Sequence, residues 1–263
     1  MCSCKKWIRY ASAAVAIFAG SSLMAQEDYE GGRGLITLEG PAGMFINPTS
    51  GTIPEGYATV QYCVFFPNED GDLFDSTPAI GHGAIAAYGV ADNLELGVQG
   101  NLIDPDSGDS VTAVGPFIRY RVMQDVEGGA PEVGVGAYSR FGDEQIQKIG
   151  LFAAASKRAT FEGPIRSAAV HLGGREVFNE EGAVDENFAA YVGLELELPL
   201  RIYAVGEYQF YTQDDDIIAP EDDPHAFGLQ WRAGGINMSV AGIANGSLED
   251  YSFYYGVGTA LDF

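Results

Sequence analysis

The feature that most constrains the fold of this chain is a two-residue alternation of apolar with polar or small side chains. It recurs from Gly56 to the C-terminus in segments of about 9–13 residues, broken by Gly, Pro, Asp and Asn. Alternation over this length predicts β-strands with one apolar face and one polar or small face. The twelve expected strands are 56–66, 80–88, 93–102, 111–122, 131–141, 147–157, 165–173, 187–198, 200–211, 225–233, 236–245 and 251–263.

The connections distinguish a membrane barrel from a soluble sandwich, because both alternate. Those after even-numbered strands are mostly tight, as at Pro199 and Gly234-Gly235, although 123–130 and 158–164 are longer. Those after odd-numbered strands are long and acidic, as at 67–79 and 212–224. Outer-membrane barrels have short periplasmic turns and longer extracellular loops. We therefore predict an all-β fold, a transmembrane up-and-down antiparallel β-barrel of about 12 strands. A secreted soluble β-sandwich that binds a ligand is the alternative.

The first residues predict export. Lys5, Lys6 and Arg9 precede an apolar run from Ala11 to about Gly20 and small residues up to Ala25. This order is typical of a secretory signal peptide, and the run is too short for a comfortable membrane span. The expected organisation is a signal peptide at 1–25, a Gly/Pro-rich segment at 26–55 and a barrel at 56–263. The middle segment is either a periplasmic tail or a short plug inside the lumen.

Composition excludes several classes. The formal charge of −23 and a pI near 4.2 argue against nucleic-acid binding through a basic surface. Three cysteines, two of them at Cys2 and Cys4, cannot form a disulfide framework, and Cys63 is expected to be a small buried residue.

The C-terminal strand resembles the signal that the barrel-assembly machinery reads in outer-membrane proteins. The chain ends in Phe, with aromatic or aliphatic residues at alternate positions before it: Phe253, Tyr255, Val257, Leu261 and Phe263. This resemblance implies insertion into the outer membrane of a Gram-negative bacterium. The implied partners are that machinery and the membrane lipid.

A second resemblance covers under a sixth of the chain. Residues 40–62 are similar to the start of YjbH-type outer-membrane proteins, which are linked to exopolysaccharide production, with Ser50 where Ala is usual. The tight turn at 88–97 is similar to a turn of the same family. The resemblance implies a barrel lineage, with an accessory role for surface polysaccharide as one possibility.

Residues on the polar face of the strands point into the lumen of a barrel. The lumen-lining candidates are Arg119, Arg121, Arg140, Lys148, Arg201, Arg232, Glu95, Glu132, Glu195, Glu197 and Glu207. Arg119 and Arg121 lie on the fourth expected strand, and Glu195 and Glu197 lie on the eighth. We therefore expect a cationic patch to face an anionic patch across the lumen, where such charges select solutes.

The number of strands leaves two functions open. Eight strands are filled by side chains and 16–18 leave a wide channel, so twelve leave room for a narrow one. The leading prediction is passive passage of small hydrophilic solutes through a porin-like lumen. The alternative is a non-conducting barrel, structural or accessory to polysaccharide, in which the lumen charges pair.

Enzymatic chemistry and cofactors are not predicted. His82, His171 and His225 have no surrounding sequence that resembles an outer-membrane hydrolase, which needs a paired nucleophile and base. Carboxylates suit divalent cations, but the loop acids lack the spacing of a dedicated site and are expected to be solvated. The alternative for these loop acids is weak divalent binding at Asp214, Asp215, Asp216, Glu221, Asp222 and Asp223.

Overall fold

A computed structural model describes residues 37, 43–66, 79–105, 109–126, 128–143, 147–178, 188–212, 224–245 and 251–263. The expected signal peptide and the six loop acids from Asp214 to Asp223 lie outside these residues. The strands are β1 (Tyr57–Phe66), β2 (Ala79–Ala91), β3 (Leu94–Pro105), β4 (Val111–Met123), β5 (Glu132–Gly142), β6 (Lys148–Thr160), β7 (Ser167–Phe178), β8 (Phe188–Leu198), β9 (Ile202–Thr212), β10 (Pro224–Ala233), β11 (Ile236–Asn245) and β12 (Tyr251–Asp262).

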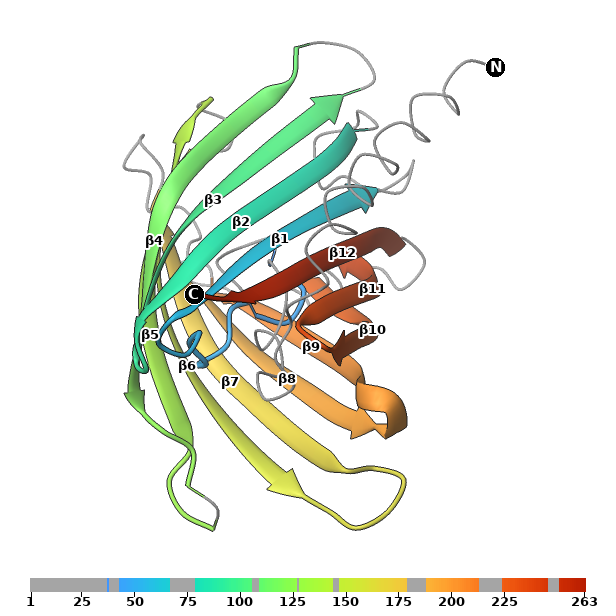
Figure 1. The fold of residues 1–263 in the computed structure, drawn as a ribbon. Coiled ribbons are helices and arrows are strands. Elements are labelled where there is room, and N and C mark those ends of the chain that lie inside the picture. Colours follow the sequence, from blue (N-terminus) through green and yellow to red (C-terminus); the bar gives the residue numbers. More distant parts are fainter. Residues whose placement is uncertain are drawn as a thin grey trace.

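The twelve strands form one closed barrel in which each strand pairs antiparallel with its neighbours along the chain. β1 pairs with β12 over ten residues, from Tyr57 opposite Asp262 to Phe66 opposite Phe253, and this pairing closes the sheet (Figure 1). The up-and-down barrel predicted from the alternation is confirmed. Closure leaves no unpaired edge, which a sheet in lipid could not tolerate.

The two faces of the sheet follow the alternation. Apolar side chains such as Val98, Leu151 and Leu194 point outward and are roughly half exposed. Exposed aromatic side chains lie toward both ends of the strands, among them Tyr88, Tyr120, Phe141, Phe210, Trp231 and Phe253. Such an apolar band with aromatic borders is typical of a lipid-facing barrel surface. Phe65, by parity an inward position, is only 2% exposed.

The two ends of the barrel differ. At the end that we call the turn end, residues 92–93, 199–201 and 234–235 join strands directly, and both ends of the barrel sequence lie there. The turn at Pro199–Arg201 is a single 3-10 turn, η2, in which Leu200 and Arg201 have φ of 65° and 57°. The opposite end, the loop end, carries the connections 67–78, 179–187 and 213–223, which lie outside the described residues.

Four strands, β2, β3, β6 and β7, run three or more residues past the ends that the alternation indicated. β6 continues to Thr160 and β7 to Phe178, beyond the expected ends at 157 and 173. The glycines Gly173 and Gly174 look like a turn in the sequence, yet both pair with β6 and β8. Among the described residues, no helix is long and apolar enough to cross a membrane.

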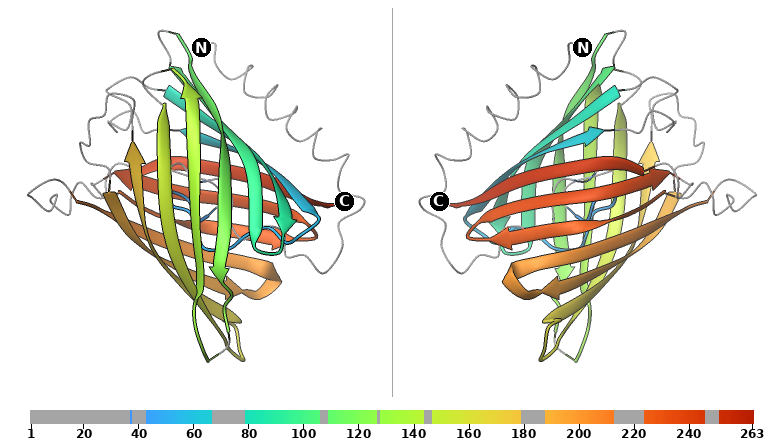
Figure 2. Two further views of the ribbon diagram at one scale, coloured as in Figure 1. Left: turned by 90° about the vertical axis from the view of Figure 1, so that its left-hand side faces the viewer. Right: turned by 90° about the vertical axis from the view of Figure 1, so that its right-hand side faces the viewer.

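Residues 43–55 are not part of the sheet and lie inside the barrel (Figure 2). Met44, Phe45, Ile46 and Asn47 are at most 3% exposed. We call residues 43–55 the plug. At its C-terminal end the plug joins β1 at Gly56, whose φ is +84° and whose amide donates to the carbonyl of Gly89.

Candidate functional site: a polar lumen closed by the plug

The plug folds back on itself at its tip. The amide of Met44 donates to the carbonyl of Asn47 at 3.0 Å, and Gly43 forms an isolated antiparallel bridge with Pro48. Residues 44–47 are therefore a tight turn, and the amides of Phe45, Ile46 and Asn47 point away from the turn toward the barrel wall. Thr37, which precedes the plug in the chain, is also buried, at 1% exposure.

A single carboxylate of the wall holds this tip. Glu207 on β9 accepts hydrogen bonds from the amides of Phe45 at 2.7 Å, Ile46 at 2.6 Å and Asn47 at 3.1 Å. The side-chain amide of Asn47 donates to the same carboxylate at 3.2 Å. Consecutive amides that converge on one anion compensate its removal from water. The buried carboxyl group of Glu207 is thus hydrogen-bonded mainly by main chain.

Other wall side chains bind the main chain of the plug. Tyr191 donates to the carbonyl of Pro48 at 2.9 Å, and Gln230 donates to that of Met44 at 3.3 Å. Arg119 donates to the carbonyls of Thr49, at 3.0 Å, and Gly51. Glu95 accepts from the amide of Ile53 at 2.9 Å. These wall residues come from β3, β4, β8 and β10, so the plug is attached to widely separated parts of the wall.

The central part of the plug follows one row of wall positions. Glu132, Ser156, His171, Gly193 and Glu207 are successive cross-strand partners on β5, β6, β7, β8 and β9. Ser50 donates to Glu132 at 2.8 Å and lies 2.6 Å from the hydroxyl of Ser156 at one end of this row. The tip binds Glu207 at the other end. The plug therefore crosses the lumen instead of running along its axis.

Glycines of the wall make room for the plug. A Cβ on Gly134 would lie 2.4 Å from the carbonyl oxygen of Ser50, and one on Gly89 would lie 1.9 Å from that of Pro54. A Cβ on Gly193 would lie 2.0 Å from the sulfur of Met44. The wall and the plug thus fit each other in shape as well as in hydrogen bonding.

Large aromatic side chains also fill the lumen. Tyr138, Tyr203, Phe117 and Phe152 are inward and at most 5% exposed, and Phe45 of the plug packs edge-on against Tyr254 at 5.7 Å between ring centroids. These residues lie on the same face as the lumen glycines. Several pairs interlock, because the ring of Tyr138 lies where a side chain on Gly150 would be.

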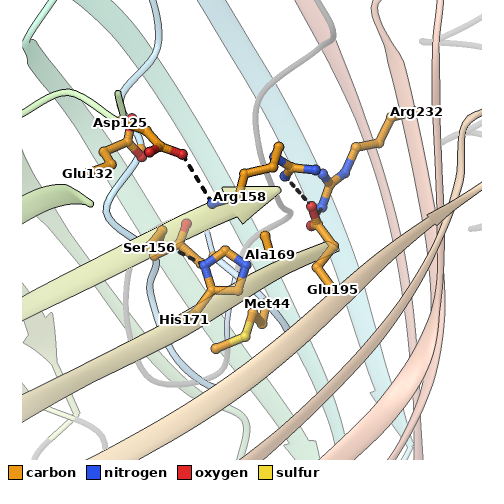
Figure 3. Close-up of a pocket in the computed structure, with 12 residues that line it drawn as sticks. Met44, Asp125, Glu132, Ser156, Arg158, Ala169, His171, Glu195 and Arg232 are labelled. Atoms are coloured by element: carbon orange, nitrogen blue, oxygen red, sulfur yellow. Dashed lines mark hydrogen bonds and ion pairs between the residues drawn. The ribbon is translucent and has the colours of Figure 1, made fainter. Parts of the chain in front are cut away.

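A second layer of charged residues lies beside the plug, toward the turn end. Glu195 on β8 pairs with Arg158 of β6 through one oxygen and with Arg232 of β10 through the other, the latter at 2.6 Å (Figure 3). Arg158 also donates to the hydroxyl of Ser167, which donates to Glu197 at 2.7 Å. The guanidinium of Arg232 stacks on Tyr203 at 4.2 Å. This network joins strands that are not neighbours.

The predicted lumen residues occupy three kinds of place. Seven are buried inside the barrel, at 5% exposure or less: Glu95, Arg119, Glu132, Arg140, Glu195, Glu207 and Arg232. Arg121, Lys148 and Glu197 are intermediate in exposure and lie near strand ends. Arg201 lies in the turn η2, before the first residue of β9, and not on a lumen-facing strand position.

The charges pair in a way that the sequence did not indicate. We expected Arg119 and Arg121 to face Glu195 and Glu197 across the lumen. Arg119 instead binds Glu95, its direct cross-strand partner on β3, at 3.3 Å. Arg121 lies 3.7 Å from Glu132 on β5. Both arginines thus find their partners on neighbouring strands. Their side chains do not have to extend across the lumen, which the plug occupies.

Several contributing residues were missing from the sequence-based set, among them Tyr191 and Gln230, which bind the plug. Arg158 and Arg175 fell beyond the expected ends of their strands, and correct strand ends would have placed both inward by parity. Arg175 donates to the side chains of Asn47 at 3.1 Å and Gln209 at 2.9 Å. Ser156 and His171 were on expected strands, but no sequence pattern linked them to Ser50.

Ser50, Ser156 and His171 form a hydrogen-bonded chain that ends at Glu132. Ser156 lies 2.8 Å from Nδ1 of His171, and Ser50 donates its one proton to Glu132.

A small cavity remains between the plug and the wall. It is lined by Met44 and Thr49 of the plug and by wall residues that include Glu132, His171 and Arg232 (Figure 3). Its volume of about 20 Å³ is room for about one water molecule. Within the described part of the chain, no group of three or more His, Cys, Asp or Glu side chains is placed to hold a metal ion.

A closed antiparallel barrel of twelve strands with a polar interior and an apolar exterior has the fold of outer-membrane porins and channels. A similar solved structure is the KdgM porin, with a TM-score of 0.52 and 11% identity, covering 78% of this chain and 99% of the porin. The KdgM porin in complex with disordered oligogalacturonate has a TM-score of 0.53, with the same identity and coverage. At this identity the similarity establishes the fold alone.

The outer membrane channel COG4313 from Pseudomonas putida F1 is also similar, with a TM-score of 0.48 and 13% identity, over 83% of this chain and 100% of the channel. No family model matches the sequence, and none of the curated proteins matches it. The resemblance of residues 40–62 to YjbH-type proteins therefore has no support from these comparisons, and residues 43–55 of that stretch form the plug.

Proposed function

We propose that this protein is an outer-membrane channel for the passive passage of small hydrophilic solutes, and that the plug sets how wide its lumen opens. The observation that carries the proposal is a closed barrel with a charged lumen wall, crossed by one segment that belongs to no strand. Polar lumen faces are typical of barrels that pass water-soluble molecules. The cavity beside the plug holds about one water molecule, so a larger solute can pass at this point only if the plug moves.

The proposed location is the outer membrane. In this proposal residues 1–25 are removed during export, and the assembly machinery then recognises the strand pattern from Phe253 to Phe263. The lumen charges that we propose to set selectivity include Arg119, Arg140, Glu195 and Arg232. The proposal assigns no catalytic role to Ser156 or His171.

A reversible lock on the plug tests this function. The hydroxyls of Ser50 and Ser156 are 2.6 Å apart, which places two cysteines within reach of a disulfide. We expect the oxidised variant with Ser50→Cys and Ser156→Cys to show lower single-channel conductance in planar bilayers than the same protein after reduction. The single variant Ser156→Cys is the matched control and should not respond to the reductant. Equal conductance of the oxidised and reduced double variant contradicts a moving plug.

A second function is favoured by one observation, the number of buried hydrogen bonds that hold the plug. A non-conducting structural barrel has no need to release the plug, and its charge pairs then serve stability alone. The two functions differ in one measurement. A folded, heat-modifiable barrel that stays silent in bilayers in both the oxidised and the reduced state supports the structural role.

A further inference from the structure

The wall of the lumen binds the plug mainly through the main chain of the plug. Eight polar contacts between described residues involve amides or carbonyls of the plug, from Met44 to Ile53. Five involve its side chains, those of Asn47, Ser50 and Thr52. Main-chain contacts are the same for any sequence that adopts this path.

The wall presents acceptors and donors in an order that matches a peptide. Glu207 and Glu95 accept from amides, whereas Gln230, Tyr191 and Arg119 donate to carbonyls. An amide chain is the class of molecule that offers donors and acceptors in alternation. Sugar hydroxyls both donate and accept but have no fixed order, whereas the amides and carbonyls of a main chain alternate at a fixed spacing. A simple ion offers only one kind of group.

The plug also shows which peptide side chains the lumen accepts. Residues 43–53 read GMFINPTSGTI and carry no charged side chain. The lumen accommodates the aromatic ring of Phe45, which packs against Tyr254. Three glycines of the wall leave space for the plug: Gly89, Gly134 and Gly193. The site is thus shaped for a short uncharged peptide with a turn.

We infer that the lumen wall formed by Glu95, Arg119, Tyr191, Glu207 and Gln230 is a binding site for short uncharged peptides, and that the plug occupies it as an internal mimic of the solute. The inference rests on the proposed channel function and names its solute class. A peptide in the lumen and the plug compete for the same groups, so the solute itself helps to keep the plug displaced.

The test uses the full-length chain with a loosened plug. Ile46→Pro removes the amide that lies 2.6 Å from Glu207, and Gly134→Ala pushes on the main chain at Ser50. A fluorescent peptide with the sequence of residues 43–53 is titrated into each variant in detergent, after a heat-modifiability gel confirms a folded barrel. We expect saturable binding that is at least about tenfold weaker when the amides corresponding to Ile46 and Asn47 are N-methylated.

Two controls isolate the main-chain contacts. A peptide N-methylated at the position of Thr49, whose amide donates to no described side chain, should bind within about twofold of the parent peptide. In the Ile46→Pro background, Glu207→Ala should weaken binding by about tenfold or more, whereas Glu162→Gln in an exposed turn should not.

Two results overturn the inference: no binding to either loosened variant, or binding that ignores N-methylation at Ile46 and Asn47. The measurement is separate from conduction. If the peptide binds with the expected dependence but the loosened barrels do not conduct, the peptide site stands and the channel function fails. If they conduct and no peptide binds, the channel stands and the solute class is wrong.

Discussion

Individual lumen residues either contact the plug or belong to the network of paired charges. Among them, the effect of a glycine depends most on its position. Gly134 has no room for a side chain, because its Cβ would lie 2.4 Å from the main-chain oxygen of Ser50. Gly206 on β9 offers a contrast, since the nearest atom to its Cβ would be 3.9 Å away. The same substitution at the two positions therefore separates an effect on the plug from an effect on strand propensity.

We expect Gly134→Ala to lower the free energy of unfolding by about 1–3 kcal/mol, the usual cost of overpacking. The displaced plug should raise single-channel conductance above that of the unmodified protein. Gly206→Ala should leave conductance unchanged. Urea unfolding and bilayer recording on the same preparations measure both quantities. An unaltered conductance in Gly134→Ala contradicts the fit between plug and wall.

The second residue-scale prediction concerns Glu195, which is shared by Arg158 and Arg232. Glu195→Gln leaves the buried Arg232 and the partly buried Arg158 with a neutral partner, so the lumen becomes more positive and the barrel loses about 3 kcal/mol of stability. We expect the reversal potential in a salt gradient to shift toward anion selectivity. Glu162→Gln, on an exposed turn, is the matched control. A shift of the same size in the control rules out a lumen effect.

At the scale of elements, the tight turn η2 carries local strain. Leu200 and Arg201 have φ of 65° and 57°, a region that favours Asn and Gly. We expect Leu200→Asn with Arg201→Gly to stabilise the barrel by about 1–2 kcal/mol, seen as a higher urea midpoint. Trp231 keeps its bond to the main-chain carbonyl of residue 200, which the substitution retains.

The same double variant tests the sequence-based assignment of Arg201 to the lumen. From its position in η2 we expect no change in ion selectivity when the arginine is removed. A reversal potential that moves with this substitution would return Arg201 to the lumen-lining set.

How much the sequence reveals differs between strands and plug. The period of two is local, so it predicted twelve strands and the inward side of Glu95, Arg119 and Glu207 without knowledge of their partners. The plug has no period, and its contacts join residues more than a hundred positions apart, such as Asn47 and Glu207. Strand ends depend on pairing with both neighbours, which is why Arg158 and Arg175 were missed.

For the whole molecule, the proposed assembly signal at the C-terminus gives the clearest prediction. Phe263 is 80% exposed at the turn end, and β12 closes the barrel against β1. We expect Phe263→Ala to reduce the amount of heat-modifiable protein in the outer-membrane fraction of cells. The substitution removes a recognition residue, and it removes no buried packing contact. Asp262→Asn is the neighbouring control. Equal amounts for both variants contradict a role of the terminal Phe in assembly.

The row of wall positions from Glu132 to Glu207 that the plug follows has a consequence for the order of folding. The tip bonds span a sequence separation of about 160 residues, so they form only after β9 has paired. Seating of the plug is then a late event in biogenesis, and the barrel is at its most permeable before that event.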